Sequence, residues 1–211
     1  MSENEAALSH EAHMVREKKD LRKRLIAKRD ALSKELRRSL SDRASLHALS
    51  LIETLAAAAP PRPLPLTLTA FLSFGSEVDT RPLIASLLEG PRPPRLLLPS
   101  LRHSKTIVLR PYDRETPLVP GPFGILEPET AESVLASEVD LFILPGIGFD
   151  RSGGRLGYGK GYFDRLLAGK SVAGKRIGLA FSVQIADRIP TASHDHPMDY
   201  LVTEEGWLTC G

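Results

Sequence analysis

The feature that most constrains the fold is an apolar run, followed by a glycine-rich charged segment and then by a helical pattern. The run VDLFILPGIGF (residues 139–149) is short enough for a strand buried on both faces. The segment RLGYGKGYFDR (residues 155–165) places three glycines at alternate positions among charged residues, and GYFDRLLAG (residues 161–169) has helical spacing. We therefore predict a strand, a loop and a helix in that order. In α/β proteins, such loops bind ligand phosphates through free backbone N–H groups and a helix N-terminus.

The rest of the chain predicts strands and helices in alternation. A helical pattern covers residues 16–43 and continues over 49–59, clustered prolines break it in 60–66, and a short helix follows at 79–90. Further strands are predicted at residues 66–74, 95–101, 106–112, 175–182 and 199–207. This order indicates an α/β fold, a single-domain open sandwich with a mostly parallel or mixed central sheet. We expect one domain over residues 16–211, preceded by a flexible tail at residues 1–15.

The charge of the chain is unevenly distributed. The formal net charge is +2, yet residues 16–43 hold 12 Lys and Arg against 5 Asp and Glu, while the remainder is net acidic. No apolar run approaches the length of a membrane span, and the acidic N-terminus resembles neither a signal peptide nor a transit peptide. The single cysteine, Cys210, cannot form an intramolecular disulfide, and we predict that its thiol is inert and exposed. A cytoplasmic location, no membrane partner and a monomer are expected.

The glycine-rich segment matches neither of two well-known phosphate loops. A P-loop has a Ser or Thr after its Gly-Lys pair, whereas here Gly161 follows Gly159 and Lys160. The dinucleotide fingerprint needs G-x-G-x-x-G, and the spacing here is G-x-G-x-G, beginning at Gly157. Glycines nevertheless allow positive φ and close approach of the chain, so that successive N–H groups form an anion-binding nest. Arg155 and Lys160 would add positive charge to that nest.

Asp164 follows within the predicted helix, close to the candidate phosphate site. A divalent metal that bridges its carboxylate to phosphate oxygens would make this acid compatible with an anionic ligand. The alternative is that the glycines form an ordinary tight turn and that Asp164 is a solvated acid in the first helical turn. Both interpretations stay open from the residues alone.

The string LPGIGFDRSGGRLGYGKGYFDR (residues 144–165) closely resembles the signature of the 5-formyltetrahydrofolate cyclo-ligase family, also called methenyltetrahydrofolate synthetases. Four further segments resemble family landmarks in the same order: KKDLR (18–22), FLSFGSEVDT (71–80), FGILEP (123–128) and HDHPMD (194–199). The resemblance implies an enzyme that uses ATP and Mg²⁺ to convert 5-formyltetrahydrofolate to 5,10-methenyltetrahydrofolate, with release of ADP and phosphate. It also implies the open α/β sandwich shared with sugar-phosphate isomerases and deaminases.

The resemblance also implies site residues. ATP would contact Lys18, Lys19, Asp20, Leu21, Arg22, Arg155, Leu156, Gly157, Tyr158, Gly159, Lys160, Gly161, Tyr162 and Phe163. Magnesium would be held by Asp164 and Asp195. The folate would lie against Leu72, Glu77, Tyr158, Gly159, Lys160, Gly161 and Tyr162, with Glu77 accepting hydrogen bonds from the pterin ring. Arg155 and Lys160 would have catalytic roles.

In the mechanism implied by the family, ATP phosphorylates the formyl oxygen to give an iminium phosphate, N10 attacks the formyl carbon, and phosphate departs. The protein then needs mainly to align the reacting groups and to neutralise the developing charge. Lys18, Arg22, Arg155 and Lys160 suit that task. The chain departs from the family pattern in having Tyr-Phe before Asp164, where Tyr-Tyr is usual, and in the residues that precede the basic motif.

Other interpretations compete with these assignments. The basic helix could be a solvated face or could bind nucleic acid, although the chain lacks the interleaved aromatics of a single-strand binder and is otherwise net acidic. We expect small-molecule partners and no nucleic acid. A non-catalytic relative could bind folate or nucleotide as a regulator. Glu77 could be a loop acid or an ion-pair partner of Arg81, and the histidines of HDHPMD, His194 and His196, are assigned no role.

Overall fold

The protein is described by a computed structural model that covers residues 3–60, 64–101, 106–169, 171–192 and 195–211. Its centre is a seven-stranded sheet with the order β12-β11-β9-β6-β1-β2-β3. The bounds are β1 Thr67–Thr69, β2 Arg95–Ser100, β3 Val108–Pro111, β6 Leu141–Leu144, β9 Lys175–Leu179, β11 Tyr200–Thr203 and β12 Gly206–Thr209. The five inner strands are parallel, and β3 and β12 are antiparallel strands at the two edges. The predicted α/β fold with a mostly parallel sheet is confirmed.

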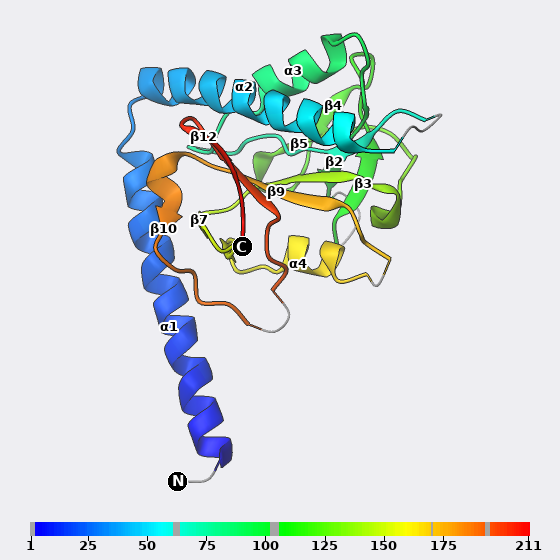
Figure 1. Cartoon of the computed structure of the whole chain (residues 1–211). Coiled ribbons are helices and arrows are strands. Elements are labelled where there is room, and N and C mark those ends of the chain that lie inside the picture. Colours follow the sequence, from blue (N-terminus) through cyan, green and yellow to red (C-terminus); the bar gives the residue numbers. More distant parts are fainter. Residues whose placement is uncertain (1–2, 61–63, 102–105, 170, 193–194) are drawn as a thin grey trace.

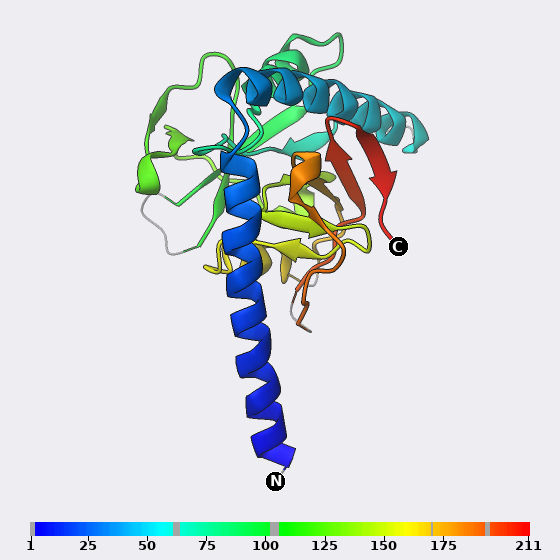
Figure 2. The same ribbon diagram turned by 90° about the vertical axis from the view of Figure 1, so that its left-hand side faces the viewer.

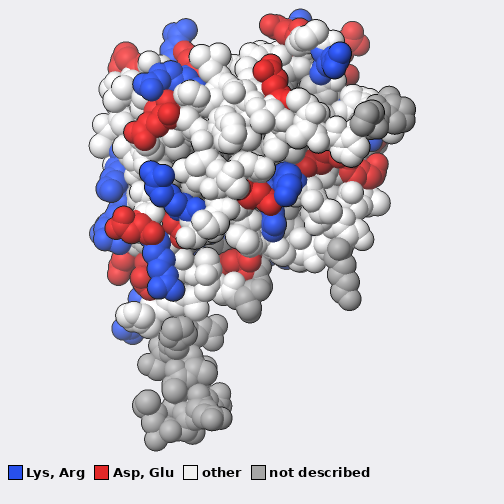
Figure 3. Space-filling view, in the orientation of Figure 1, with Lys and Arg blue, Asp and Glu red and all other residues white. Residues whose placement is uncertain are grey.

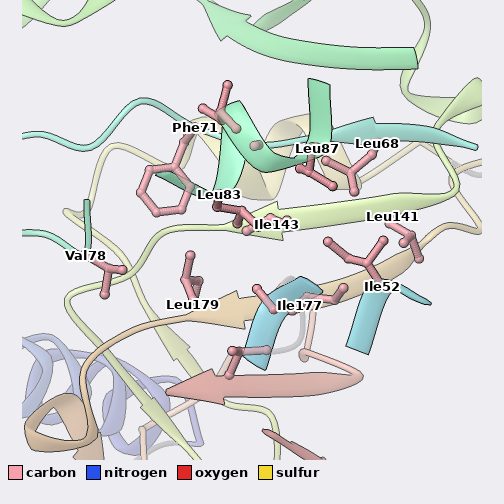
Figure 4. Packing of buried hydrophobic residues seen from close by; sticks show 14 of the residues in the cluster. Ile52, Leu68, Phe71, Val78, Leu83, Leu87, Leu141, Ile143, Ile177 and Leu179 are labelled. Carbon is pink, nitrogen blue, oxygen red and sulfur yellow. The ribbon is translucent and has the colours of Figure 1, made fainter. Parts of the chain in front are cut away.

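Helices cover both faces of this sheet. On one face lie α2 (Lys34–Ala58) and α3 (Arg81–Glu89), which contact each other above the strands (Figure 1). Their apolar side chains pack on the inner strands, as Figure 4 shows for Leu83 near Ile143 and for Ile52 near Leu141. The short helix α4 (Tyr162–Leu167) packs through Leu167 against a separate cluster that contains Phe142. Successive residues of β6 thus point to opposite faces, and all four are buried, which explains its continuous apolar sequence.

The N-terminal helix α1 (Glu3–Asp30) runs along one side of the domain and extends beyond it (Figures 1 and 2). Its C-terminal half packs through Leu21 and Leu25 on a small cluster with Ile147 and Leu156. The prediction of one helix over residues 16–43 was wrong, because the chain breaks between α1 and α2. Residues 3–15, which the sequence suggested were a flexible tail, form the first part of α1, and their mobility stays a prediction.

The break has a local cause. Ser33 adopts an extended conformation, and its side chain accepts a hydrogen bond from the Leu36 N–H at 3.1 Å, which caps the first turn of α2. Because α2 starts with its own cap, it does not continue α1 and can run in a different direction, as Figure 1 shows. The continuation of helix to residue 58 was predicted correctly.

Two predicted strands each divide into two. The run at residues 139–149 becomes β6 and β7 (Gly148–Asp150), separated at Pro145, which has no N–H for the ladder. A side chain on Gly146 would lie 2.6 Å from the Phe149 ring, so the chain can fold back here only with glycine. The run at residues 199–207 becomes the hairpin β11–β12, and the strand predicted at 66–74 is limited to β1.

Two smaller sheets complete the fold. One has the order β10-β7-β8, with β8 Arg155–Leu156 and β10 Ile185–Ala186, and the other pairs β4 Leu118–Pro120 with β5 Leu126–Pro128. Short 3-10 helices occur at η1 Pro122–Gly124, η2 Ala136–Glu138 and η3 Ser182–Gln184. Within the described ranges, none of the helices combines the length and the apolar character that crossing a membrane requires.

Candidate active site

The glycine-rich loop is held at its base by a buried carboxylate. Asp150, at the end of β7, accepts hydrogen bonds at Oδ1 from the backbone N–H groups of Ser152 and Gly154, at 2.9 and 2.8 Å. Its Oδ2 accepts from the Ile189 N–H at 2.6 Å. One side chain therefore ties the β7–β8 turn to the loop that follows β10. The sequence offered no separate signal for this role, because Asp150 lies inside a motif already assigned to ligand binding.

Past β8, the chain takes the conformations that the glycines were predicted to allow. Gly159 and Gly161 have φ of +85° and +63°, in the left-handed region, whereas Gly157 lies outside it. Gly161 is also the residue that caps α4. Among the described residues, no acceptor is found for the backbone N–H groups of residues 158–161. These donors are therefore available to a ligand.

Cations of α1 reach this loop and the C-terminal loop. Arg22 donates from Nε to the Gly157 carbonyl oxygen at 2.8 Å, and its burial lowers the pKa of the guanidinium. Lys18 Nζ forms an ion pair with Asp195 Oδ2 at 2.9 Å. Figure 2 shows α1 crossing in front of the small sheet and beside η3, with which it is in contact. Three segments that the sequence predicts to form one site thus lie together.

Arg155 and Asp164 form a second ion pair, between Nη2 and Oδ1. The Arg155 side chain is only 6% exposed and stacks over the Phe163 ring, with Cζ 5.7 Å from the ring centroid. Its Nε is buried and has no hydrogen-bond partner within the described part of the chain. The two carboxylates predicted to bind metal, Asp164 and Asp195, are therefore each paired with a cation predicted to bind ATP.

A cavity of about 370 Å³ opens beside these groups. It is lined by the β7–β8 turn and by residues from 187–192 and 195–197, and its walls include Arg155, Asp195 and the half-buried His196. In the described part of the chain, no three Asp, Glu, His or Cys side chains gather as a metal cage. Magnesium in nucleotide sites needs only one or two carboxylates, since phosphate oxygens and water supply the other ligands. The carboxylates of Asp164 and Asp195 fit that donor set.

The loop also meets the segment that was predicted to hold the folate, through the residue that follows Gly157. Tyr158 donates from its hydroxyl to Glu77 Oε1 at 2.9 Å, and the Phe74 N–H donates to Glu77 Oε2 at 2.9 Å. Burial raises the pKa of Glu77, and burial together with the Glu77 charge raises the pKa of Tyr158. Phe74 and Tyr158 are about half exposed, so aromatic surface borders the carboxylate. The alternative pairing of Glu77 with Arg81 is wrong, because Arg81 pairs with Asp79 at 3.0 Å.

Arg29 joins this group and was missed in the sequence. It donates from Nε to Ser76 Oγ at 2.9 Å and from Nη2 to the Tyr158 hydroxyl at 3.3 Å. The side chain is buried although it is charged. A signal was present, because Arg29 stands one turn after Leu25 on the apolar stripe of α1, where a leucine would be ordinary.

The remaining predicted residues lie in varied surroundings. Lys19, Asp20 and Lys160 are exposed, and the Lys160 carbonyl accepts from Arg165. Buried in the apolar clusters are Leu21, Leu72 and Leu156, whose side chains contribute packing at the rim of the site. Tyr162 lies under the Arg165 guanidinium, with Cζ 5.2 Å from the ring centroid. His194 lies outside the described residues.

Cys210 is half-buried rather than exposed, since it packs against the cluster beside α4. Burial, with a smaller contribution from the nearby carboxylates of Asp150 and Asp199, raises the pKa of its thiol to about 11. The thiolate is therefore scarce at neutral pH, which agrees with the predicted lack of reactivity.

The fold and site define a class: a single-domain α/β protein in which a glycine-rich loop joins a basic helix to a carboxylate-bearing segment beside a parallel sheet. The chain belongs to the 5-formyltetrahydrofolate cyclo-ligase family, whose model matches residues 14–204. It is thus an enzyme of the ligase class. The family resemblance seen in the sequence is confirmed.

Individual relatives agree with this assignment. The chain is 35% identical to the 5-formyltetrahydrofolate cyclo-ligase of Haemophilus influenzae, over 74% of this chain and 81% of that one. It is 32% identical to the enzyme of the same name from Escherichia coli, over 68% and 81% of the two chains. The NMR structure of Aquifex aeolicus 5,10-methenyltetrahydrofolate synthetase superposes with a TM-score of 0.76 at 36% identity and covers 91% of this chain and 92% of that one. A synthetase from Mycoplasma pneumoniae, at 24% identity and a TM-score of 0.66, shares the fold.

Proposed function

We propose that this protein converts 5-formyltetrahydrofolate to 5,10-methenyltetrahydrofolate with consumption of ATP, in the presence of Mg²⁺, and releases ADP and phosphate. The observation that carries the proposal is that one loop contacts both candidate subsites. Gly157 accepts from Arg22 on the side of the candidate nucleotide subsite, and Tyr158, the next residue, donates to Glu77 on the side of the candidate folate subsite. A nucleotide and a folate bound in these two subsites would have their reacting groups over the same few residues.

ATP would bind between α1 and the glycine loop. Lys18, Arg22, Arg155 and Lys160 supply positive charge, and the N–H groups of residues 158–161 supply donors for phosphate oxygens. Asp164 and Asp195 would hold the magnesium ion, which when bound neutralises phosphate charge. The two carboxylates are paired with Arg155 and Lys18. Binding of the nucleotide with its metal would exchange these ion pairs for ligand contacts, so that little uncompensated charge is created.

The folate would bind beside Leu72, Glu77 and residues 158–162. Each Glu77 oxygen accepts one hydrogen bond from the protein, and a carboxylate oxygen has lone pairs for two. Two acceptor sites are thus left, which suits the adjacent N–H and NH₂ donors of a pterin ring. The exposed faces of Tyr158 and Phe74 supply apolar area for the rest of the ligand.

The chemistry begins with a poor leaving group, the formyl oxygen. We propose that this oxygen attacks the γ-phosphorus of ATP and breaks its bond to ADP, which gives an iminium phosphate. N10 then adds to the formyl carbon, the proton of N10 is lost, and the carbon–oxygen bond breaks as phosphate leaves with both electrons. Arg155, Lys160 and the loop N–H groups would orient the transferred phosphoryl group and neutralise its charge.

Small molecules are the partners that this site favours over nucleic acid. Three cations of α1, namely Lys18, Arg22 and Arg29, contact the body of the protein. On the face seen in Figure 3, basic and acidic side chains are interspersed rather than gathered into one basic patch. A monomer in the cytoplasm stays a prediction.

The test is a spectroscopic assay of the purified protein with 5-formyltetrahydrofolate, ATP and Mg²⁺, in which each component is omitted in turn. We expect the methenyl product only when all are present, with one ADP formed per product. If no product forms while equilibrium dialysis detects bound folate or ATP, the protein is a non-catalytic binder. If neither ligand binds, the proposed function is wrong.

A further inference from the structure

Arg29 is a buried cation whose hydrogen bonds are incomplete. The residue as a whole is only 5% exposed. Nε and Nη2 donate to Ser76 and Tyr158, but Nη1 is buried and has no partner within the described residues. Native proteins seldom bury a donor without an acceptor, because the lost solvation is not recovered. Such a group within a candidate binding site points to a ligand atom as the missing acceptor.

The surroundings of Arg29 limit what that ligand atom can be. Through the Tyr158 hydroxyl, two hydrogen bonds of 3.3 and 2.9 Å connect the guanidinium to the Glu77 carboxylate, and the two charges interact. A phosphate placed here would meet the negative charge of Glu77. Arg29 also lies seven residues beyond Arg22 along α1, about 10 Å along the helix axis from the cation that reaches the glycine loop. A neutral acceptor flanked by N–H donors fits this position better than an anion does.

A pterin ring presents such an edge. Its 4-oxo group is an acceptor, and the neighbouring ring N–H and 2-amino group are donors. The protein offers the complementary order, a donor on Arg29 followed by the two unused acceptor sites of Glu77, held together by Tyr158. This complementarity would fix both the orientation of the ring and the identity of its substituent at position 4.

We propose that Arg29 is a substrate-binding residue whose Nη1 donates to the 4-oxo group of the folate, and that it makes the site selective for 4-oxo over 4-amino pterins. The inference rests on the proposed function, because it assumes that the subsite beside Glu77 receives the folate. A 4-amino group would place a donor against the Nη1 donor, which leaves both without an acceptor. Rejection of this kind is strong because it depends on unpaired buried groups rather than on shape.

The test compares binding of 5-formyltetrahydrofolate and of its 4-amino counterpart to wild type and to Arg29→Gln, by calorimetry. We expect wild type to favour the 4-oxo ligand. Arg29→Gln should lose about ten-fold or more in affinity for the 4-oxo ligand, as for a charge-assisted hydrogen bond, with a much smaller loss for the 4-amino ligand. The matched control is Arg24→Gln, an exposed arginine on the same helix, which should keep the wild-type ratio.

A ratio of 4-oxo to 4-amino affinity that is unchanged in Arg29→Gln would overturn the proposal. If that ratio is unchanged because both affinities fall equally, Arg29 only supports the fold. If Arg29→Gln does not fold, as judged by circular dichroism, Arg29→Lys replaces it and is expected to lower the same ratio, because one ammonium cannot replace the fork of donors. Turnover by wild type is measured in parallel. Absence of turnover with a ratio that depends on Arg29 contradicts the proposed catalysis alone, whereas turnover with a ratio independent of Arg29 contradicts this inference alone.

Discussion

The negative charge of Glu77 lowers the stability of the folded protein, and we propose that this charge serves to bind the folate. Its pKa is raised because burial outweighs the hydrogen bonds from Phe74 and Tyr158 and the attraction of Arg29. A carboxyl with a raised folded-state pKa contributes most stability below its ordinary pKa, and that contribution is lost as the pH rises through the raised value. At neutral pH the charged side chain is therefore unfavourable to the fold.

This sign leads to a prediction for Glu77→Gln. At neutral pH the variant should unfold at a higher temperature than wild type, and the difference should shrink as the pH falls toward the ordinary range for glutamic acid. Affinity for 5-formyltetrahydrofolate should fall at the same time, because an amide accepts with only one of its two polar atoms. Thermal unfolding across pH and calorimetric titration measure the two effects. A variant that is less stable than wild type at neutral pH would show that the pairing of Glu77 outweighs its burial.

Asp164 has two candidate roles that kinetics can separate. As a magnesium ligand it should be needed for turnover, and Asp164→Asn should lower the rate by more than the roughly ten- to hundred-fold typical of the neighbours of metal ligands. The Mg²⁺ concentration that gives half the maximal rate should rise, while folate affinity stays nearly unchanged. The control is Asp42→Asn, an exposed acid on α2. A slower rate with unchanged Mg²⁺ dependence would mean that Asp164 acts by orienting Arg155, its ion-pair partner.

At the scale of elements, the glycine loop joins the ligand subsites, and its backbone conformation depends on glycine. Gly159 has φ of +85°, and a Cβ there would meet only Arg22 atoms at 3.5 Å or more, so space is sufficient and strain is the main cost. We predict that Gly159→Ala lowers the free energy of unfolding by about 1–2 kcal/mol, the cost of a left-handed conformation.

The matched variant is Gly157→Ala, at a glycine outside the left-handed region whose Cβ would lie 3.4 Å from Arg155. Denaturant unfolding of both variants should show the larger loss for Gly159→Ala. If the two losses are equal, the positive φ at residue 159 does not control the stability of the loop.

The junction of α1 and α2 determines how the basic helix meets the domain. The Ser33 hydroxyl caps α2 by accepting from Leu36, and removal of such a cap typically costs about 1 kcal/mol. Ser33→Ala should lose that stability in urea unfolding, whereas Ser39→Ala, at an exposed position inside α2, should change it little or raise it slightly. Equal stability of the two variants would mean that tertiary packing, not the cap, determines where α2 begins.

At the scale of the whole molecule, the sequence predicted most of the architecture because each element has its own local pattern. The buried parallel strands, such as β6, are continuous apolar runs, and the short helix predicted at residues 79–90 is α3. The errors occurred where a local pattern continues through a change of direction. The break at Ser33 depends on a side-chain cap, and the fold-back at Gly146 depends on the close approach of the Phe149 ring. Neither feature produces a periodic pattern in the sequence.

The site was predictable where residue types are unusual and was missed where the role depends on contact across the fold. The glycines and charges of residues 155–165 are conspicuous in the sequence. The contribution of Arg29 depends on Ser76 and Tyr158, which are far from it along the chain. Sequence also could not show that Lys18 pairs with Asp195, since 177 residues separate them.

The first part of α1 extends away from the domain, and the side-chain contacts described between α1 and the body begin at Lys18. The family match begins at residue 14. We predict that deletion of residues 1–13 leaves turnover and the thermal unfolding midpoint close to those of the full chain. Circular dichroism and the product assay check this. A marked loss of activity would show that this part of the helix contributes to the site.

The central claim is that one loop brings the formyl oxygen to the γ-phosphate of ATP. Its most direct test uses 5-formyltetrahydrofolate with a heavy oxygen isotope in the formyl group and follows the label by mass spectrometry during turnover. Transfer of one labelled oxygen to the released phosphate, in step with the methenyl product, is the predicted result. Unlabelled phosphate beside labelled water would contradict phosphorylation of the formyl oxygen, and product formed without any phosphate would contradict the role of ATP.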